Sequence, residues 1–161
     1  MQHSTTGHEA TTRARALISA REFEGVVATV LDNNKDMDQA VADRIVTQAL
    51  AFVATCARFP GRGLRPSRIV DEGWHALILH TLVYAKLCSN EGGFVHHTPE
   101  RPDPSRHNAG ELERSMAAIA AAGFEVDDML WLAPTDASLP VTATCEHTPQ
   151  KCAACMDGGP N

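Results

Sequence analysis

Apolar residues recur along most of the chain with the spacing of a helix face. Between residues 23 and 31 they stand at i, i+3, i+4, i+7 and i+8, the pattern of an amphipathic helix. A shorter helix is expected from about Thr12 to Ile18. A longer stripe runs from about Met37 to Arg58, with Asp36 as the expected N-cap and Gln39 completing a capping box. The apolar positions of the two stripes are Phe23, Val26, Val27, Val30, Leu31, Val41, Ile45, Ala49, Phe52, Val53 and Cys56.

The stretch from Ser67 to about Ser89 is apolar almost all the way around. Ser67 is placed to cap a helix, and few polar residues interrupt the run that follows. A helix without a polar face is expected to be central and buried. Gly92 and Gly93 should end it, and a short extended segment follows them.

The last predicted helix follows a proline-rich loop. Asn108 and Glu111 indicate its N-terminus, Gly123 is placed as its C′ residue, and a short helical turn is expected after Asp127. No strand pattern longer than a few residues appears. The sequence therefore predicts an all-α fold, a compact bundle of about four to five helices around a buried central helix. Residues 1–12 are expected to form a flexible arm, 13–133 the helical domain and 134–161 a Cys/His-containing tail.

Composition narrows the class of protein. With 161 residues, 43% hydrophobic and 21% charged, the chain has the length and balance of one soluble globular domain. A formal charge of −6 argues against a nucleic-acid partner. We expect no membrane association, because no secretory signal and no membrane-spanning apolar run is visible. A cytoplasmic protein is expected, in which the five cysteines are thiols, redox groups or metal ligands.

Acidic and imidazole side chains gather around the predicted central helix. Asp71 and His75 stand four residues apart, so a helix places them on one face. His96 and His97 follow the glycines, in a segment that can fold back. Neighbours in an extended segment point to opposite sides, so one of the pair should reach the helix; we prefer His97, with His96 as its rival. His80 lies off the Asp71–His75 face.

Two histidines and one carboxylate form a ligand set for Zn²⁺ or Fe²⁺ that leaves coordination positions open. With zinc, bound water acts as a hydrolytic nucleophile; with iron, the same triad supports oxygenase chemistry. The alternative needs no metal. Asp71 is then a residue hydrogen-bonded near a helix start, His75 a satisfied buried histidine, and the His96–His97 pair a surface feature.

The same stretch resembles a segment of the glycine-rich-domain proteins, which are large plant proteins with short actinobacterial relatives. The pattern is D-x-x-W-H, then I-L-x-T-x-x-Y, then C, then G-x-F-x-H-H-x-P, here from Asp71 to Pro99. The plant members carry a further histidine where this chain has Leu77. The resemblance implies a helical domain with a shared polar centre and brings no reaction with it.

The tail offers a second group of soft ligands. Its members are Cys145, His147, Cys152 and Cys155. Their spacing suits a second, closed zinc site, and equally a flexible thiol segment, a redox pair at Cys152 and Cys155, or a transient carrier of a soft metal such as Cu⁺. Two functions follow. One is a small metalloenzyme, a metal-dependent hydrolase or non-haem iron oxygenase acting on a small molecule or peptide. The other is a non-enzymatic metal-binding or regulatory module that acts through the Cys145–Cys155 tail.

Overall fold

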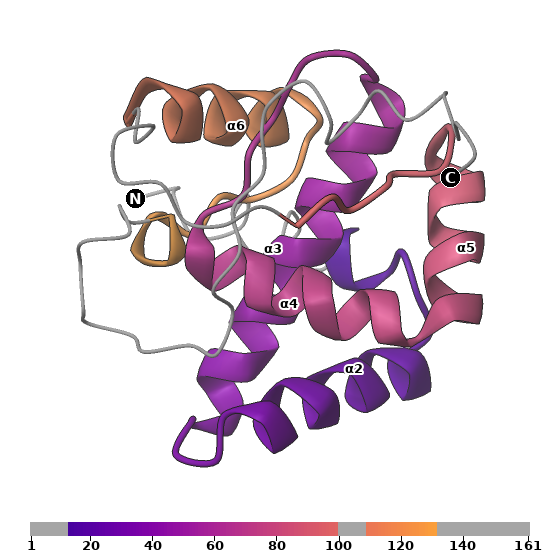
Figure 1. Ribbon diagram of the computed structural model, residues 1–161, viewed down its shortest axis with the longest axis vertical. Coiled ribbons are helices and arrows are strands. Elements are labelled where there is room, and N and C mark those ends of the chain that lie inside the picture. Colours follow the sequence, from indigo (N-terminus) through magenta and orange to yellow (C-terminus); the bar gives the residue numbers. More distant parts are fainter. Residues whose placement is uncertain (1–12, 100–108, 132–161) are drawn as a thin grey trace, which may run out of the picture.

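The computed structural model describes residues 13–99 and 109–131, and these residues are helical with no strand among them. The all-α prediction is therefore confirmed (Figure 1). A helical turn at 13–15 precedes the main elements. These are α2 (Ala20–Asn33), α3 (Gln39–Arg58), α4 (Arg68–Leu79), α5 (Thr81–Glu91), α6 (Ala109–Ala121) and the 3-10 turn η2 (Asp128–Leu130).

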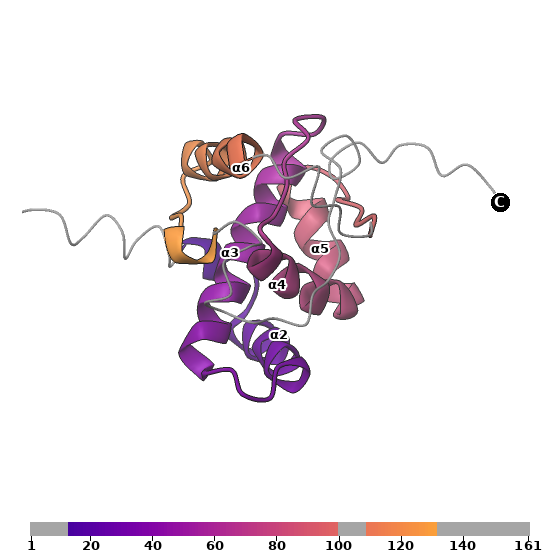
Figure 2. The same ribbon diagram turned by 60° about the vertical axis from the view of Figure 1, so that its left-hand side comes forward.

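Helix α3 is the centre of the fold. It packs against α2, α4, α5 and α6, and α2 and α6 lie toward its opposite ends (Figures 1 and 2). Every residue from Ile45 to Ala57 is buried, including the polar Thr55. The prediction that the 67–89 stretch is the central helix is therefore wrong. Leucines that made it look buried are partly at the surface: Leu79 is 67% exposed and Leu82 is 82% exposed.

The same 67–89 stretch forms two helices rather than one. They meet at His80, whose φ of −86° and ψ of 65° end α4 and begin α5. The imidazole Nε2 lies 2.9 Å from Thr29 Oγ1 of α2. This bond ties the corner to α2, and α5 leaves it in a new direction (Figure 1).

Capping residues set where the helices begin. Ser19 and Glu22 form a reciprocal capping box at the start of α2, which the sequence reasoning missed. Helix α3 is capped by Asp38, which accepts a 2.8 Å bond from the Ala40 amide, rather than by Asp36. The prediction that Ser67 caps α4 is confirmed by the bond that its hydroxyl accepts from the amide of Val70.

The last described elements, α6 and the turn η2, pack against α3. Helix α6 ends at Ala121, and Gly123, with a φ of +87°, follows it as the predicted C′ residue. The predicted turn after Asp127 is η2. The indole of Trp131 then donates to Gln48 of α3. The predicted cap at Asn108 lies outside the described residues.

Helix α3 alone, among the described residues, is long and apolar enough to cross a membrane by length and composition. Because 78% of its most apolar window is buried against other helices, it matches the core helix of a soluble protein. The cytoplasmic location stays a prediction.

Candidate metal centre

Helix α4 presents Asp71 and His75 on one face, one turn apart. The carboxylate is buried, with 1% of its side chain exposed, whereas His75 retains 30%. The Nε2 atom of His75 lies 3.6 Å from Oδ2 of Asp71. The spacing of four residues that suggested this pair from the sequence therefore places the two groups side by side.

The segment after α5 brings a second imidazole to the same carboxylate. Gly92, with a φ of +136°, ends the helix, and the chain then runs back toward α4 (Figure 1). His97 Nε2 lies 3.1 Å from Oδ1 of Asp71, and its side chain is 8% exposed. The ring centroids of His97 and His75 are 4.4 Å apart. Both imidazoles thus direct Nε2 at one carboxylate.

Other imidazole and acidic side chains of the described residues do not belong to this cluster. His96 is exposed, with its ring centroid 4.7 Å from that of Phe94. His80 is bonded to Thr29 at the helix corner. Glu72 is buried but receives a 2.8 Å bond from the side-chain amide of Asn34. The tail residues Cys145, His147, Cys152 and Cys155 lie outside the described residues.

The geometry of the cluster suits a small cation. One ligand atom from each of Asp71, His75 and His97 can be chosen so that all three lie within 4.8 Å of one another. Ligand atoms about 2.0–2.2 Å from a tetrahedral zinc lie roughly 3.3–3.6 Å apart. Each imidazole Nε2 lies near that distance from a different carboxylate oxygen, His75 at 3.6 Å from Oδ2 and His97 at 3.1 Å from Oδ1 of Asp71. A buried carboxylate also needs positive charge nearby, which a protonated imidazole or a cation supplies.

A family model matches residues 12–121, most of the chain and all of this cluster. The chain belongs to the UCP032817-like family. This overturns the resemblance to glycine-rich-domain proteins, because that family is not the one matched. No curated protein and no solved structure matches the chain. The UCP032817-like family is uncharacterised, so membership assigns neither a ligand nor a reaction.

A buried hydrogen-bonded network lies next to the Asp71–His75–His97 cluster. The indole Nε1 of Trp74 donates to the hydroxyl of Tyr84 over 2.9 Å, and that hydroxyl donates to the carbonyl of Val95. The Trp74 ring meets that of His97 edge-on, with centroids 4.5 Å apart. Sequence reasoning missed this network, because a bond to a main-chain carbonyl leaves no signal in the sequence.

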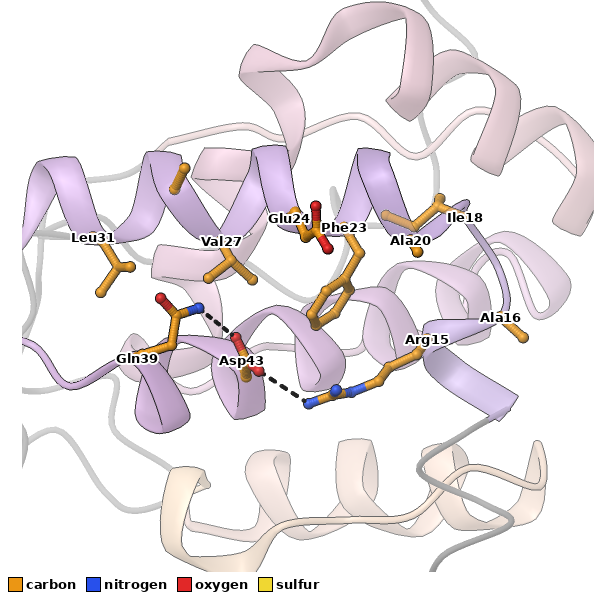
Figure 3. A pocket seen from close by; sticks show the side chains of 11 residues that line it. Arg15, Ala16, Ile18, Ala20, Phe23, Glu24, Val27, Leu31, Gln39 and Asp43 are labelled. Atoms are coloured by element: carbon orange, nitrogen blue, oxygen red, sulfur yellow. Dashed lines mark hydrogen bonds and ion pairs between the residues drawn. The ribbon is translucent and has the colours of Figure 1, made fainter.

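A groove of about 700 Å³ lies elsewhere, between α2, the start of α3 and residues 15–20. Figure 3 shows Phe23 and Val27 along it, with Gln39, Asp43 and Arg15 linked at its edge. None of its lining residues belongs to the Asp71–His75–His97 cluster. The groove therefore offers no substrate pocket for chemistry at that cluster.

Proposed function

We propose that this protein binds one divalent metal ion, Zn²⁺ or Fe²⁺, through Asp71, His75 and His97, and that it is a small metalloenzyme. The observation that carries the proposal is the convergence of two imidazole Nε2 atoms on one buried carboxylate. Imidazole nitrogen and carboxylate oxygen are ligands that both metals accept.

The composition of the cluster favours a catalytic site over a structural one. Structural zinc sites are usually closed by four protein ligands, whereas three ligands leave a position for water or substrate. The partial exposure of His75 gives that position a route to solvent, while Asp71 and His97 are almost covered. A metal held there supplies an acidified water for hydrolysis if it is zinc, or a site for oxygen chemistry if it is iron. The substrate class we expect is a small molecule or a peptide.

Metal analysis of the full chain, purified without chelator, tests the binding. We expect about one zinc or iron per chain. Removing a ligand should weaken binding by more than ~100-fold in His97→Ala, because even partners outside the ligand set cost about 10- to 100-fold. The matched control is His96→Ala, the adjacent exposed histidine, whose affinity should stay within about twofold of wild type. Equal losses in the two variants, or a chain that holds no metal when supplied with it, would refute the proposal.

The non-enzymatic alternative is separated by a variant of the tail in the full chain. Cys152→Ser with Cys155→Ser should leave the metal at Asp71, His75 and His97 in place. Loss of all metal in that double variant would favour the regulatory module instead. Any hydrolytic or oxygen-dependent turnover should disappear in His97→Ala and persist in the tail variant.

A further inference from the structure

The segment that carries His97 is held against the core two residues earlier, at Val95. Val95 is 2% exposed, and its carbonyl accepts a hydrogen bond from the hydroxyl of Tyr84 in α5. Tyr84 itself is 3% exposed and accepts the bond from the fully buried indole of Trp74 in α4. The hydroxyl thus joins both helices to the returning segment.

This fastening determines which side of the segment meets α4. Burial alternates along it: Val95 is buried, His96 is exposed and the side chain of His97 is 8% exposed. Side chains two residues apart in an extended segment lie on the same side. Fixing Val95 against the core therefore directs His97 toward Asp71.

Two further features make the fastening specific. Burial raises the pKa of the Tyr84 hydroxyl well above its ordinary value, so it keeps its proton and remains a donor. The hydroxyl oxygen also accepts the bond from the indole of Trp74, which sets the direction of its O–H group. The single hydroxyl proton is therefore left to donate to the Val95 carbonyl.

We propose that Tyr84 is a positioning residue of the metal centre. By donating a hydrogen bond to the Val95 carbonyl, it holds the imidazole of His97 close enough to Asp71 for both side chains to bind one metal ion. This inference rests on the proposed metal-binding function. Partners of this kind, beyond the ligands themselves, typically contribute about 10- to 100-fold to metal affinity.

Tyr84→Phe in the full chain removes the hydroxyl and keeps the ring. We expect zinc affinity, measured by competition with a chelator, to fall by about tenfold or more. The control is Thr55→Val, which removes another buried hydroxyl, one bonded within α3 to Ala51. Its zinc affinity should stay within about twofold of wild type, whatever its stability. Equal losses in Tyr84→Phe and Thr55→Val would overturn the inference.

A double-variant cycle tests whether Tyr84 acts through His97. In a His97→Ala background, Tyr84→Phe should change the residual zinc affinity by less than about twofold, because the group it positions is gone. A tenfold loss in that background too would overturn the inference. Should Tyr84→Phe fail to fold by circular dichroism, Trp74→Phe removes the indole N–H group that donates to the same hydroxyl and serves in the same cycle.

A separate readout distinguishes failure of this inference from failure of the proposed function. If wild-type protein binds neither zinc nor iron, the proposed function is wrong. The imidazole ¹⁵N resonances of His97 in metal-free protein then report its placement directly. They should shift in Tyr84→Phe and stay in place in Thr55→Val; unchanged resonances in Tyr84→Phe would overturn the positioning role.

Discussion

Gly73 lies where α4 crosses α3, and replacing it by alanine tests how closely the two helices pack. A Cβ atom at this position would lie 2.9 Å from Ala49 Cβ, from Ile45 Cγ2 and from the Ile45 carbonyl oxygen. Carbon atoms in favourable contact are about 3.5–4.0 Å apart. Because one of the obstacles is main chain in the most buried helix, a side-chain rotation cannot remove the clash. The helices must separate.

The expected cost follows from two opposing terms. Overpacking a core typically costs about 1–3 kcal/mol, and contact with three atoms places Gly73→Ala near the upper end. Alanine in a helix interior returns up to about 1 kcal/mol relative to glycine. We therefore expect the free energy of unfolding to fall by about 2 kcal/mol, which lowers Tm by roughly 4–8 °C for a domain of this size.

The matched control is Gly25→Ala in the interior of α2. Its Cβ would meet only the His80 ring, at 3.4 Å, so the propensity term should dominate. We expect a gain of about 0.5–1 kcal/mol. Urea unfolding followed by circular dichroism measures both variants, with unchanged m-values as the check on two-state behaviour. A Gly73→Ala protein as stable as wild type would refute the reasoning, as would a loss of stability in Gly25→Ala equal to that in Gly73→Ala.

Two further predictions concern α5 and the turn that follows it. Gly92→Ala should lower the free energy of unfolding by about 2–4 kcal/mol, because φ is +136° and the new Cβ would lie 2.7 Å from the Ala57 carbonyl oxygen. The control Gly61→Ala has a φ of +82° but open space around the new Cβ, so it should lose only the stability that the backbone strain costs. Equal urea midpoints for the two variants would contradict this prediction. Burial raises the pKa of the Cys88 thiol, so the folded chain holds a proton that the unfolded chain loses, and stability should fall as pH rises above roughly 8.5. Cys88→Ala should flatten that fall by up to about 1.4 kcal/mol per pH unit in urea unfolding from pH 7 to 10, and parallel curves would count against it.

The helices that could be predicted from the sequence are those with one consistent apolar stripe. The stripe from Val41 to Cys56 predicted helix α3, but a stripe implies only one buried face, whereas every residue from Ile45 to Ala57 is buried. The 67–89 stretch has no such asymmetry, so nothing in its pattern marks the corner at His80. That corner depends on a bond to Thr29, a residue far away in the sequence. A tertiary contact of this kind can set where a helix ends, and the sequence around that position does not show it.

The candidate centre was partly predictable for the same reason. Asp71 and His75 are related by helix geometry alone, so their spacing sufficed to place them together. The alternation between His96 and His97 favoured one of the pair, and the described geometry places His97 at the carboxylate. The hydrogen bond from Tyr84 to Val95 could not be predicted from the sequence, because every residue has a main-chain carbonyl that could accept it. Whether a metal occupies the cluster stays a prediction.

The burial of every residue from Ile45 to Ala57 has a consequence for the solubility of the chain in a cell. A helical stretch with no face toward water is not stable by itself, so this part of α3 depends on the helices packed around it. Release of one of them exposes part of this mainly apolar stretch, and exposed apolar surface is bound by chaperones and promotes aggregation. Truncated chains that lack α2 or α6 should therefore appear in the insoluble fraction of expressing cells. Substitutions that weaken the packing around α3 should first show themselves as a low yield of soluble protein.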